Sequence, residues 1–562
     1  MLPALTPSGP SSLTQQFLHT LQALGFKGDI HSDYASRSVL ATDNSIYQVL
    51  PQAVLYPKDQ QDLVYILELA ATTTFKELVL SPRGGGTGTN GQSLTAGIMV
   101  DLSKHMNQIL AIDPERRTAR VQAGVVKDQL NAALKPHGLF FAPELSTSNR
   151  ATLGGMINTD ASGQGSVLYG KTRDHVLSLS TVLLGGQVWQ SEAIEDAELD
   201  SLCARTDRVG QIHQLLRDID SQHGKLIKAK FPPLNRCLTG YDLAHIRDEQ
   251  GRFNLNNILC GSEGTLGFIS EATLNCLPIP KHTALVVVTY PDFNAALRHA
   301  NALMSAQPAS IETVDSTVLN LAMQDNAWQE VAEFFPSSGA PVQGINLVEF
   351  IGDELEALEA CLAAFAQRLE REQQELNACS GYSLVRGAAS VNKIWGMRKK
   401  AVGLLGNAAG EARPVPFVED TAVPPEHLAD YIAEFRALLD ARGLRYGMFG
   451  HVDAGVLHVR PALDLKDPAQ AKQIRAISDE VAALTYKYGG LLWGEHGKGV
   501  RSEYAPQFFG ELYPQLQRIK AAFDPNNQLN PGKIATPSAH SALLKIDEVS
   551  MRGEFDRQIA VN

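Results

Sequence analysis

The segment Ser81-Pro-Arg-Gly-Gly-Gly-Thr-Gly-Thr-Asn-Gly-Gln-Ser93 decides the fold of this chain. Five glycines lie between Gly84 and Gly91, after the apolar run Leu78-Val79-Leu80, which predicts a strand. Backbone N–H groups in such a loop can turn toward anionic oxygens, because glycine adopts positive φ angles at little cost. A Rossmann loop would open a helix, whereas Gly97–Leu102 predicts another strand. The pattern therefore indicates a pyrophosphate site outside a Rossmann fold, with an ordinary glycine-rich surface loop as the alternative.

Later segments share the same glycine-rich character. They are Pro143–Gly155, which ends in TLGG, the stretch 158–174, and Gly261–Ser270, which contains GSEGTLG. Together with the first loop they resemble the flavin domain of the vanillyl-alcohol oxidase/para-cresol methylhydroxylase superfamily, over roughly residues 45–282. The resemblance implies an α+β fold in which two subdomains bind FAD. Many members attach FAD through a histidine in or near the first loop. None stands between Ser81 and Gly91, so we expect non-covalent FAD.

The resemblance assigns FAD contacts to all these segments and to the later motif Asn530-Pro-Gly-Lys533. The cofactor-binding residues expected from it are Arg83, Gly84, Gly85, Gly86, Thr87, Gly88, Thr89, Asn90, Gln92, Ser93, Pro143, Leu145, Thr152, Gly154, Gly155, Asn158, Ser162, Gly163, Tyr169, Gly170, Glu263, Gly264, Gly267, Ile269 and Asn530.

Composition and charge narrow the class of protein. The chain has 562 residues, of which 44% are hydrophobic and 20% charged, as is usual for globular proteins. Its net charge of −12 argues against a nucleic-acid partner, which usually needs a basic face. Six cysteines are widely spread without a C-x-x-C pair, so neither disulfides nor a metal cluster is expected from them. Without a signal peptide or a transmembrane run, we expect a cytoplasmic protein or one peripheral to the inner membrane.

Sequence patterns predict several domains in a chain of this length. Ser12 begins a capping box, and Val182–Val188 predicts a hairpin. After the Pro-bounded stretch Leu277–Lys281, the apolar run Ala284–Tyr290 predicts a buried strand. Alternation with long helices such as Asp353–Leu376 predicts a second, α/β domain on an antiparallel sheet. The expected parts are an N-terminal helical segment (1–44), an FAD-binding domain (45–282), a substrate or cap domain (283–500), a C-terminal segment completing the FAD domain (501–540) and a tail or linker (541–562).

Two histidine segments in the second half predict a metal site. In GHVDAGVLH, the spacing of His451 and His458 fits two ligands joined by a turn rather than one helix face. In GEHGKG, glycines surround Glu495 and His496. Two imidazoles and one carboxylate form a common divalent-metal set, here His451, His458 and Glu495, which zinc, manganese and iron all fit. The alternative is that these are unrelated core or surface histidines.

The same segments resemble the substrate domain of the FAD-linked D-2-hydroxyacid dehydrogenases, which act on D-lactate, D-2-hydroxyglutarate and glycolate. The family pattern G-H-x-x-x-G-N-x-H falls on the two histidines, with Val456 in place of the asparagine, and G-E-H-G falls on the Glu-His pair. Trp395-Gly-Met-Arg398 matches the family's W-x-x-R. The resemblance implies two catalytic residues. Arg398 would hold the substrate carboxylate, and His496 would accept the hydroxyl proton.

Two further segments resemble one branch of this family. The bend before Arg460 and the tail Lys545–Arg557 resemble the branch that carries FAD and iron–sulfur centres on one polypeptide. An iron–sulfur cluster is therefore expected only on a further C-terminal domain or on a partner subunit.

The expected reaction is oxidation of a D-2-hydroxy acid, with D-2-hydroxyglutarate first and D-lactate or glycolate next. Electrons would pass to an acceptor protein, an iron–sulfur domain or a quinone, although an oxidase using O₂ stays open. Arg460, Lys399 and Lys393 are candidates for a second substrate carboxylate. Two other classes remain as alternatives, a metal-dependent hydrolase that uses the same histidines and a flavin electron-transfer subunit without a substrate site.

Overall fold

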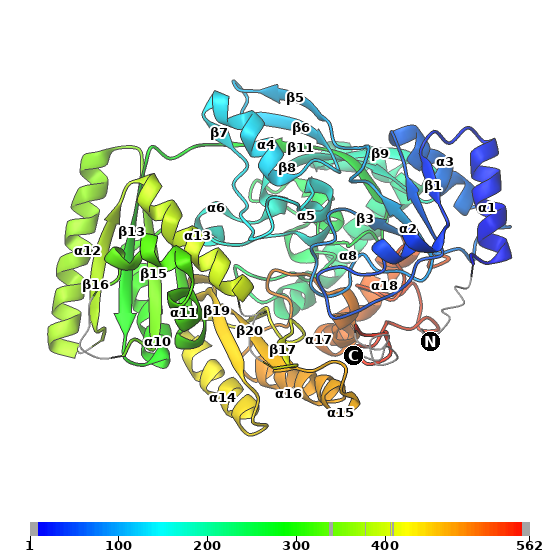
Figure 1. The fold of residues 1–562 in the computed structure, drawn as a ribbon. Coiled ribbons are helices and arrows are strands. Elements are labelled where there is room, and N and C mark those ends of the chain that lie inside the picture. Colours follow the sequence, from blue (N-terminus) through cyan, green and yellow to red (C-terminus); the bar gives the residue numbers. More distant parts are fainter. Residues whose placement is uncertain (1–8, 337–340, 377, 405, 407–409, 553–562) are drawn as a thin grey trace.

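The computed structural model describes residues 9–336, 341–376, 378–404, 406 and 410–552. The expected segments 1–44 and 541–562 thus lie partly outside the described residues, at 1–8 and 553–562. The described chain forms an α+β fold with two main sheets and a two-stranded pair in its first half and a larger sheet in its second (Figure 1).

The first sheet ends at the glycine loop. Its order is β1-β2-β4-β3, with β2, β4 and β3 parallel and β1 antiparallel at one edge. The strands are β1 (Asp29–His31), β2 (Ala53–Tyr56), β3 (Leu80–Arg83) and β4 (Ile98–Asp101). The strand expected before the loop is present but begins at Leu80, because Leu78 closes a turn onto Phe75. The glycine loop therefore starts directly at the carboxyl end of β3.

The second sheet is antiparallel and has the order β10-β9-β8-β11-β6-β5. The predicted hairpin is confirmed, since Val182 of β8 pairs with Val188 of β9. Its strands are β5 (Ile109–Asp113), β6 (Thr118–Gln122), β8 (Val176–Val182), β9 (Val188–Ile194), β10 (Phe253–Asn254) and β11 (Phe268–Asn275), and a separate pair is formed by β7 (Leu139–Phe140) and β12 (Leu277–Pro278).

Helices cover both sheets of this half. The cap of the first is Ser11 rather than Ser12, because the Ser11 side chain accepts the N–H of Thr14. The helices are α1 (Ser12–Ala23), α2 (Tyr34–Val39), α3 (Gln60–Ala70), α4 (Lys127–Leu134), α5 (Leu153–Thr159), α6 (Ser166–Tyr169), α7 (Asp196–Cys203), α8 (Arg208–Lys230) and α9 (Asn256–Leu259).

The third sheet is antiparallel throughout, as predicted, and has eight strands. Its main path is β16-β13-β15-β14-β19-β20-β17, and β18 also pairs with β20. The strands are β13 (His282–Tyr290), β14 (Ser310–Asp315), β15 (Gly344–Gly352), β16 (Gly381–Arg386), β17 (Arg413–Pro414), β18 (Thr421–Ala422), β19 (Tyr446–His451) and β20 (Val456–Leu463).

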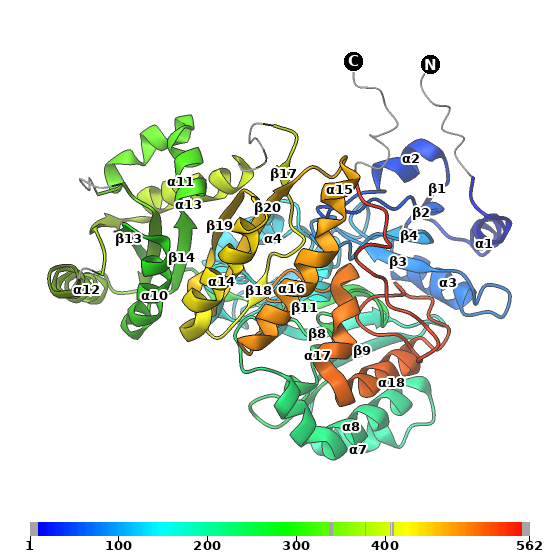
Figure 2. The same cartoon turned by 90° about the horizontal axis from the view of Figure 1, so that it is seen from below.

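The apolar run Ala284–Tyr290 is buried on both faces of β13, because helices pack on each side of the sheet. Val286 and Val288 pack against α10 and α12, whereas Leu285 and Val287 pack against α11 and α13. Figure 2 shows α14 and α16 beside the β19–β20 end of the sheet. The helices are α10 (Phe293–Leu303), α11 (Ser316–Met323), α12 (Leu355–Leu376), α13 (Ala388–Leu404), α14 (Leu428–Asp440), α15 (Pro468–Ala471) and α16 (Gln473–Lys487).

The chain then returns to its first half through α17 (Ala505–Phe509) and α18 (Tyr513–Phe523). Helix α18 packs against α8, and Phe523 joins the core of the second sheet. Beyond it, the Leu80 N–H donates to Gln528 O and the Asn530 N–H donates to Leu80 O, both at 2.8 Å. The segment after α18 therefore extends the first sheet alongside β3.

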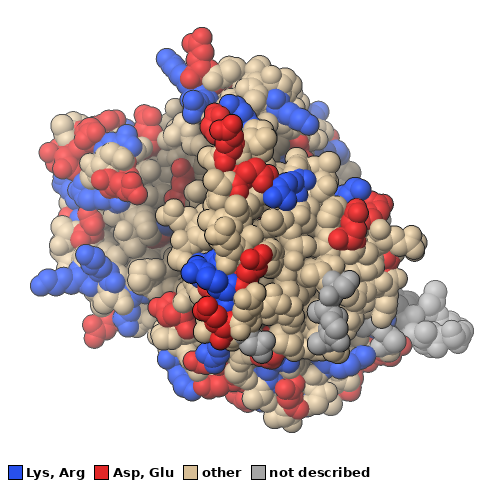
Figure 3. All heavy atoms as spheres, turned by 90° about the vertical axis from the view of Figure 1, so that its left-hand side faces the viewer, with Lys and Arg blue, Asp and Glu red and all other residues tan. Residues whose placement is uncertain are grey.

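The face of the molecule in Figure 3 is mixed in charge. On the face in Figure 3, acidic and basic side chains alternate, and none of the described residues there builds an extended patch of one sign. Within the described residues, no helix combines the length and apolar character needed to cross a membrane.

A buried ion pair holds this C-terminal return in place. Lys520 and Asp524 are fully buried and lie 2.6 Å apart, and Lys520 Nζ also donates to the carbonyls of Thr265 and Leu529. Replacing Lys520 with Met leaves the Asp524 carboxylate buried without its partner. We expect Lys520→Met to lower the free energy of unfolding by about 3–5 kcal/mol, measured by urea denaturation followed by tryptophan fluorescence.

The control is Lys545→Met, which removes an exposed pair with Glu548. It should leave the unfolding curve close to that of the parent, because exposed pairs contribute little. Equal stability of the two variants would contradict a structural role for the buried pair.

Candidate active site

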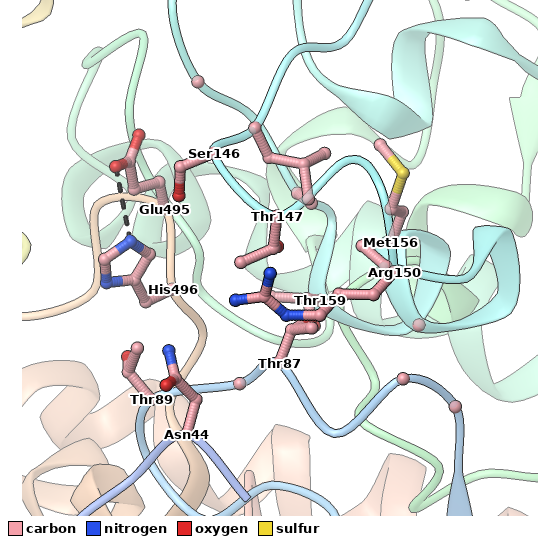
Figure 4. Close-up of a pocket in the computed structure, with 18 of the residues that line it drawn as sticks. Asn44, Thr87, Thr89, Ser146, Thr147, Arg150, Met156, Thr159, Glu495 and His496 are labelled. Carbon is pink, nitrogen blue, oxygen red and sulfur yellow. Dashed lines mark ion pairs between the residues drawn. The ribbon is translucent and has the colours of Figure 1, made fainter. Parts of the chain in front are cut away.

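A cavity of about 530 Å³ lies where the glycine loop meets α13 and the β19–β20 hairpin. Its volume falls in the range of small-molecule and cofactor pockets, roughly 300–1,000 Å³. Figure 4 shows the Arg150 guanidinium beside Thr87 and Thr147, pointing toward the wall that carries Glu495 and His496. The cavity thus brings together residues from both halves of the chain.

The glycine loop has the features of an anion site. A Cβ atom at Gly84 would lie 2.1 Å from Thr152 Oγ1, and one at Gly85 would lie 2.2 Å from the Arg150 carbonyl oxygen. Among the described residues, none accepts a hydrogen bond from the backbone N–H groups of residues 84–89. Thr89 Oγ1 is also buried without a partner among those residues. These unpaired donors fit a bound pyrophosphate.

Most of the residues expected to bind the cofactor lie in the walls of this cavity. They are Arg83, Gly84, Gly85, Gly86, Thr87, Gly88, Thr89, Gln92, Ser93, Leu145, Thr152, Gly154, Gly155, Asn158, Ser162, Gly163 and Glu263. The structure therefore gathers segments that are up to 180 positions apart, Arg83 to Glu263, around one space.

The remaining expected residues do not line the cavity, and Asn530 and Gly264 among them hold its walls. Asn530 Nδ2 donates to the carbonyls of Gln92 at 2.9 Å and Glu263 at 2.6 Å. A Cβ at position 264 would lie 2.2 Å from Pro82 Cγ, so glycine at this position permits close packing against β3. The residues in question are Asn90, Pro143, Tyr169, Gly170, Gly264, Gly267, Ile269 and Asn530.

Hydrogen bonds join the cofactor loop to the GEHGKG segment. Asn90 Nδ2 donates to the Gly497 carbonyl at 2.8 Å, and Gln92 Nε2 donates to the His496 carbonyl. The Glu263 carboxylate accepts the N–H groups of Lys498 at 2.6 Å and Gly499 at 2.9 Å. The wall that carries His496 is thus fixed to the wall that carries the glycines.

The β19–β20 hairpin supplies a second set of cavity residues. Alternate residues of a strand share one face, so β19 presents Phe449 and His451, and β20 presents His458 and Arg460, toward the cavity. The two strands are joined by a turn through Gly455, which has φ +70°. The turn expected between the two histidines is therefore present.

The Glu495 carboxylate lies at the centre of three imidazoles. Its Oε1 is 3.3 Å from His451 Nε2, 2.8 Å from His458 Nε2 and 3.5 Å from His496 Nε2. The rings of His458 and His496 stack with centroids 4.9 Å apart. All three predicted metal-binding residues and the predicted base thus meet at one point.

Two buried glutamates each connect one of these histidines to an arginine. Glu312 accepts from Arg398 Nη2 at 2.5 Å and contacts His451 Nδ1, its cross-strand neighbour. Glu419 Oε2 accepts a hydrogen bond from Arg460 Nε at 2.6 Å. Its other oxygen, Oε1, lies 3.0 Å from His496 Nδ1. Carboxylates on the far nitrogen of a metal-binding histidine fix its orientation and tautomer.

The two arginines share one aromatic ring. The guanidinium carbons of Arg398 and Arg460 lie 5.3 Å and 5.5 Å from the centroid of Phe449. Both arginines line the cavity, as does Lys399, whereas Lys393 does not. The cavity therefore presents two fixed guanidinium groups beside the histidine cluster.

Burial and neighbouring charges set the protonation of the cluster. Burial alone lowers the pKa of His496, but Asp420 and Glu419 outweigh it and raise that pKa to about 9. Burial lowers the pKa of His458 to about 4 despite the charge of Glu495, so this imidazole is neutral at pH 7. Burial would raise the pKa of Glu495, but His451 and Arg236 hold it well below its ordinary value.

A neutral imidazole beside a charged carboxylate suits a divalent metal. Asp420, His458, Glu495 and His496 also have ligand atoms within 4.8 Å of one another. Both Asp420 oxygens, however, accept backbone N–H groups, from Glu495 and His496 at 2.7 Å each. The predicted set of His451, His458 and Glu495 is also close together, since Glu495 Oε1 lies 3.3 Å from His451 Nε2 and 2.8 Å from His458 Nε2.

Several residues of the site were not predicted from the sequence. Arg150 lies inside the segment that ends in TLGG, where an arginine in a polar loop gave no signal of its own. Glu312 stands between Ile311 and Thr313 in a strand of mixed polarity, and Glu419 stands between Val418 and Asp420, so neither glutamate gave a signal of its own. Arg236 had no recognisable signal.

Both halves of the chain are similar to known proteins. Residues 51–191 match the family model described as FAD binding domain, and residues 279–534 match FAD linked oxidases, C-terminal domain. A structure of p-cresol methylhydroxylase with substrate bound superimposes with a TM-score of 0.65 at 14% identity, covering 94% of this chain and 98% of that chain. The likeness confirms the fold expected from the sequence.

Curated relatives are similar along the whole chain. It is 62% identical to a D-2-hydroxyglutarate dehydrogenase of Pseudomonas putida and 54% identical to one of Escherichia coli, over 100% of its length in both cases. It covers 56% of each of those proteins, and so spans about half the length of the curated relatives it matches. Together with the two family models, these similarities show that the chain belongs to the FAD-linked oxidases.

Proposed function

We propose that this chain uses FAD to oxidise D-2-hydroxyglutarate to 2-oxoglutarate. The observation that carries the proposal is the pair of arginines on Phe449, held beside three imidazoles around Glu495. Two guanidinium groups match a substrate with two carboxylates, and the imidazole cluster matches a hydroxyl that must lose its proton. The relatives named D-2-hydroxyglutarate dehydrogenase support the same substrate.

The cofactor-binding residues that line the cavity would hold FAD. The free N–H groups of residues 84–89 would bind its pyrophosphate, and Arg150 would add a positive charge nearby. Because no histidine stands between Ser81 and Gly91, we infer non-covalent binding. When bound, FAD supplies the acceptor for a hydride, which carries two electrons and one proton.

His451, His458 and Glu495 would hold the divalent metal, with zinc, manganese and iron as candidates. When bound, a divalent cation supplies a Lewis acid that favours loss of the hydroxyl proton. The cation would also lower the pKa of His496, opposing Asp420 and Glu419. His496 Nε2 would then be free to take the hydroxyl proton.

The arginines would orient the acid. Arg398 would bind the C1 carboxylate, and Arg460 the distal one, each already held by its buried glutamate. Fixing both ends of the substrate determines whether the single hydrogen on the hydroxyl-bearing carbon faces the flavin side of the cavity. This would exclude the L-enantiomer.

The electrons would pass to a further acceptor. The relatives are longer than this chain, and an iron–sulfur domain, an acceptor protein or a quinone would fit as the next carrier. Membership of the FAD-linked oxidases favours this reading over a metal-dependent hydrolase.

The glycine loop gives a test of the cofactor site. Gly84→Ala places a methyl group against Thr152 Oγ1, and such overpacking costs about 1–3 kcal/mol. We expect FAD affinity to fall by about 10- to 100-fold, read from flavin absorbance after equilibrium dialysis. Gly224→Ala is the matched control, since nothing lies within 4 Å of its added Cβ. Full FAD retention by Gly84→Ala would place the pyrophosphate elsewhere.

The arginine pair gives a test of the substrate. Arg460→Met should raise the KM for D-2-hydroxyglutarate by about 10- to 100-fold. Losing a charge-assisted hydrogen bond costs about 1.5–3 kcal/mol of binding free energy, which corresponds to that factor. The KM for D-lactate, which lacks the distal carboxylate, should change little. Steady-state kinetics with an artificial electron acceptor would measure both constants.

Two further variants sharpen the comparison. Arg398→Met should impair both substrates, because both carry the C1 carboxylate. Lys393→Met, outside the cavity, should impair neither. If Arg460→Met affected the two acids equally, Arg460 would not be the distal-carboxylate residue.

A further inference from the structure

Arg236 is a buried charge that the proposed reaction does not use. It lies in the irregular segment between α8 and β10, and its residue surface is 1% exposed. A buried guanidinium costs several kcal/mol of desolvation unless it is well paired. The partners of Arg236 therefore indicate its role in the structure.

The Arg236 guanidinium binds two walls of the cavity at once. Nη1 donates to Glu495 Oε2 and, at 2.9 Å, to Ser162 Oγ. Nη2 donates to the Gly163 carbonyl. Ser162 and Gly163 line the cavity on the cofactor side. One guanidinium thus connects the carboxylate of the histidine cluster to the cofactor wall.

The neighbours of Arg236 hold its backbone between the same two segments. Asn235 Oδ1 accepts from Ser166 Oγ at 2.7 Å, and the Cys237 carbonyl accepts from Lys171 Nζ at 3.0 Å. The Leu238 N–H donates to the Trp493 carbonyl at 2.7 Å, two residues before Glu495. Four consecutive residues, 235–238, are therefore bonded to the stretches 162–171 and 493–495, which contain the wall residues that Arg236 joins. These bonds fix the backbone from which the Arg236 side chain extends.

The two oxygens of Glu495 have different partners. With Oε2 bound to the guanidinium, Oε1 is the oxygen that lies within 3.5 Å of His451, His458 and His496. Without that bond, the carboxylate could rotate and divide its oxygens differently among the imidazoles. We propose that Arg236 is a positioning residue that presents a single oxygen of Glu495 to the metal.

This inference rests on the proposed metal site, and zinc binding tests the two separately. The FAD-containing protein, stripped of metal, would be titrated with Zn²⁺ against a chromogenic chelator. Outer partners of metal ligands typically contribute about 10- to 100-fold to affinity. We expect Arg236→Lys, which keeps the charge but loses the fork, to raise the Kd for Zn²⁺ by that factor. Arg236→Met should raise it further.

Arg501→Lys is the matched control. Arg501 is also buried, but it donates to the backbone carbonyls of Glu419 and Leu492 rather than to Glu495. Its Zn²⁺ affinity should match that of the parent, and retained FAD absorbance would show that each variant is folded. An unchanged Kd in Arg236→Lys would overturn the positioning role alone. No Zn²⁺ binding by the parent, with FAD bound, would overturn the metal site and this inference together.

Discussion

The bonds between the cofactor loop and the GEHGKG segment are the constraint on which the site depends. Asn90 and Gln92 donate to the carbonyls of Gly497 and His496, and Glu263 accepts the next two N–H groups. Glycine allows this approach, because a Cβ at Gly499 would lie 2.1 Å from the Asn90 carbonyl oxygen. Without these bonds, the two halves of the chain would each carry part of a site, and neither part could act alone.

Buried charges of alternating sign then organise the space between the two walls. Glu312 and Glu419 each pair a histidine with an arginine, and Glu495 lies between three imidazoles and Arg236. Each such ion costs several kcal/mol to bury, so the network is a weak source of stability. Its value lies in fixed geometry, since Arg398, Arg460 and Glu495 are each held from behind by a partner of opposite charge.

How much could be predicted depended on whether the signal was local. The glycine loop, the β8–β9 hairpin and the buried run Ala284–Tyr290 follow from neighbouring residues, and the structure contains all three. His451 and His458 were found because one turn joins them. Glu312, Glu419 and Arg236 were not, because each acts on residues at least 41 positions away, and only tertiary packing brings them together. Conversely, Gly264 and Asn530 stand in recognisable motifs yet support the walls rather than line the cavity.

The most direct measurement is the visible spectrum of the FAD-loaded protein under anaerobic conditions, before and after addition of one acid. The account predicts that D-2-hydroxyglutarate bleaches the flavin bands, whereas its L-enantiomer does not and D-lactate does so only weakly. Flavin bands that persist with D-2-hydroxyglutarate but bleach with the L-enantiomer would contradict the orientation imposed by the two arginines. A protein that shows no flavin bands after reconstitution with FAD would contradict the account at the cofactor itself.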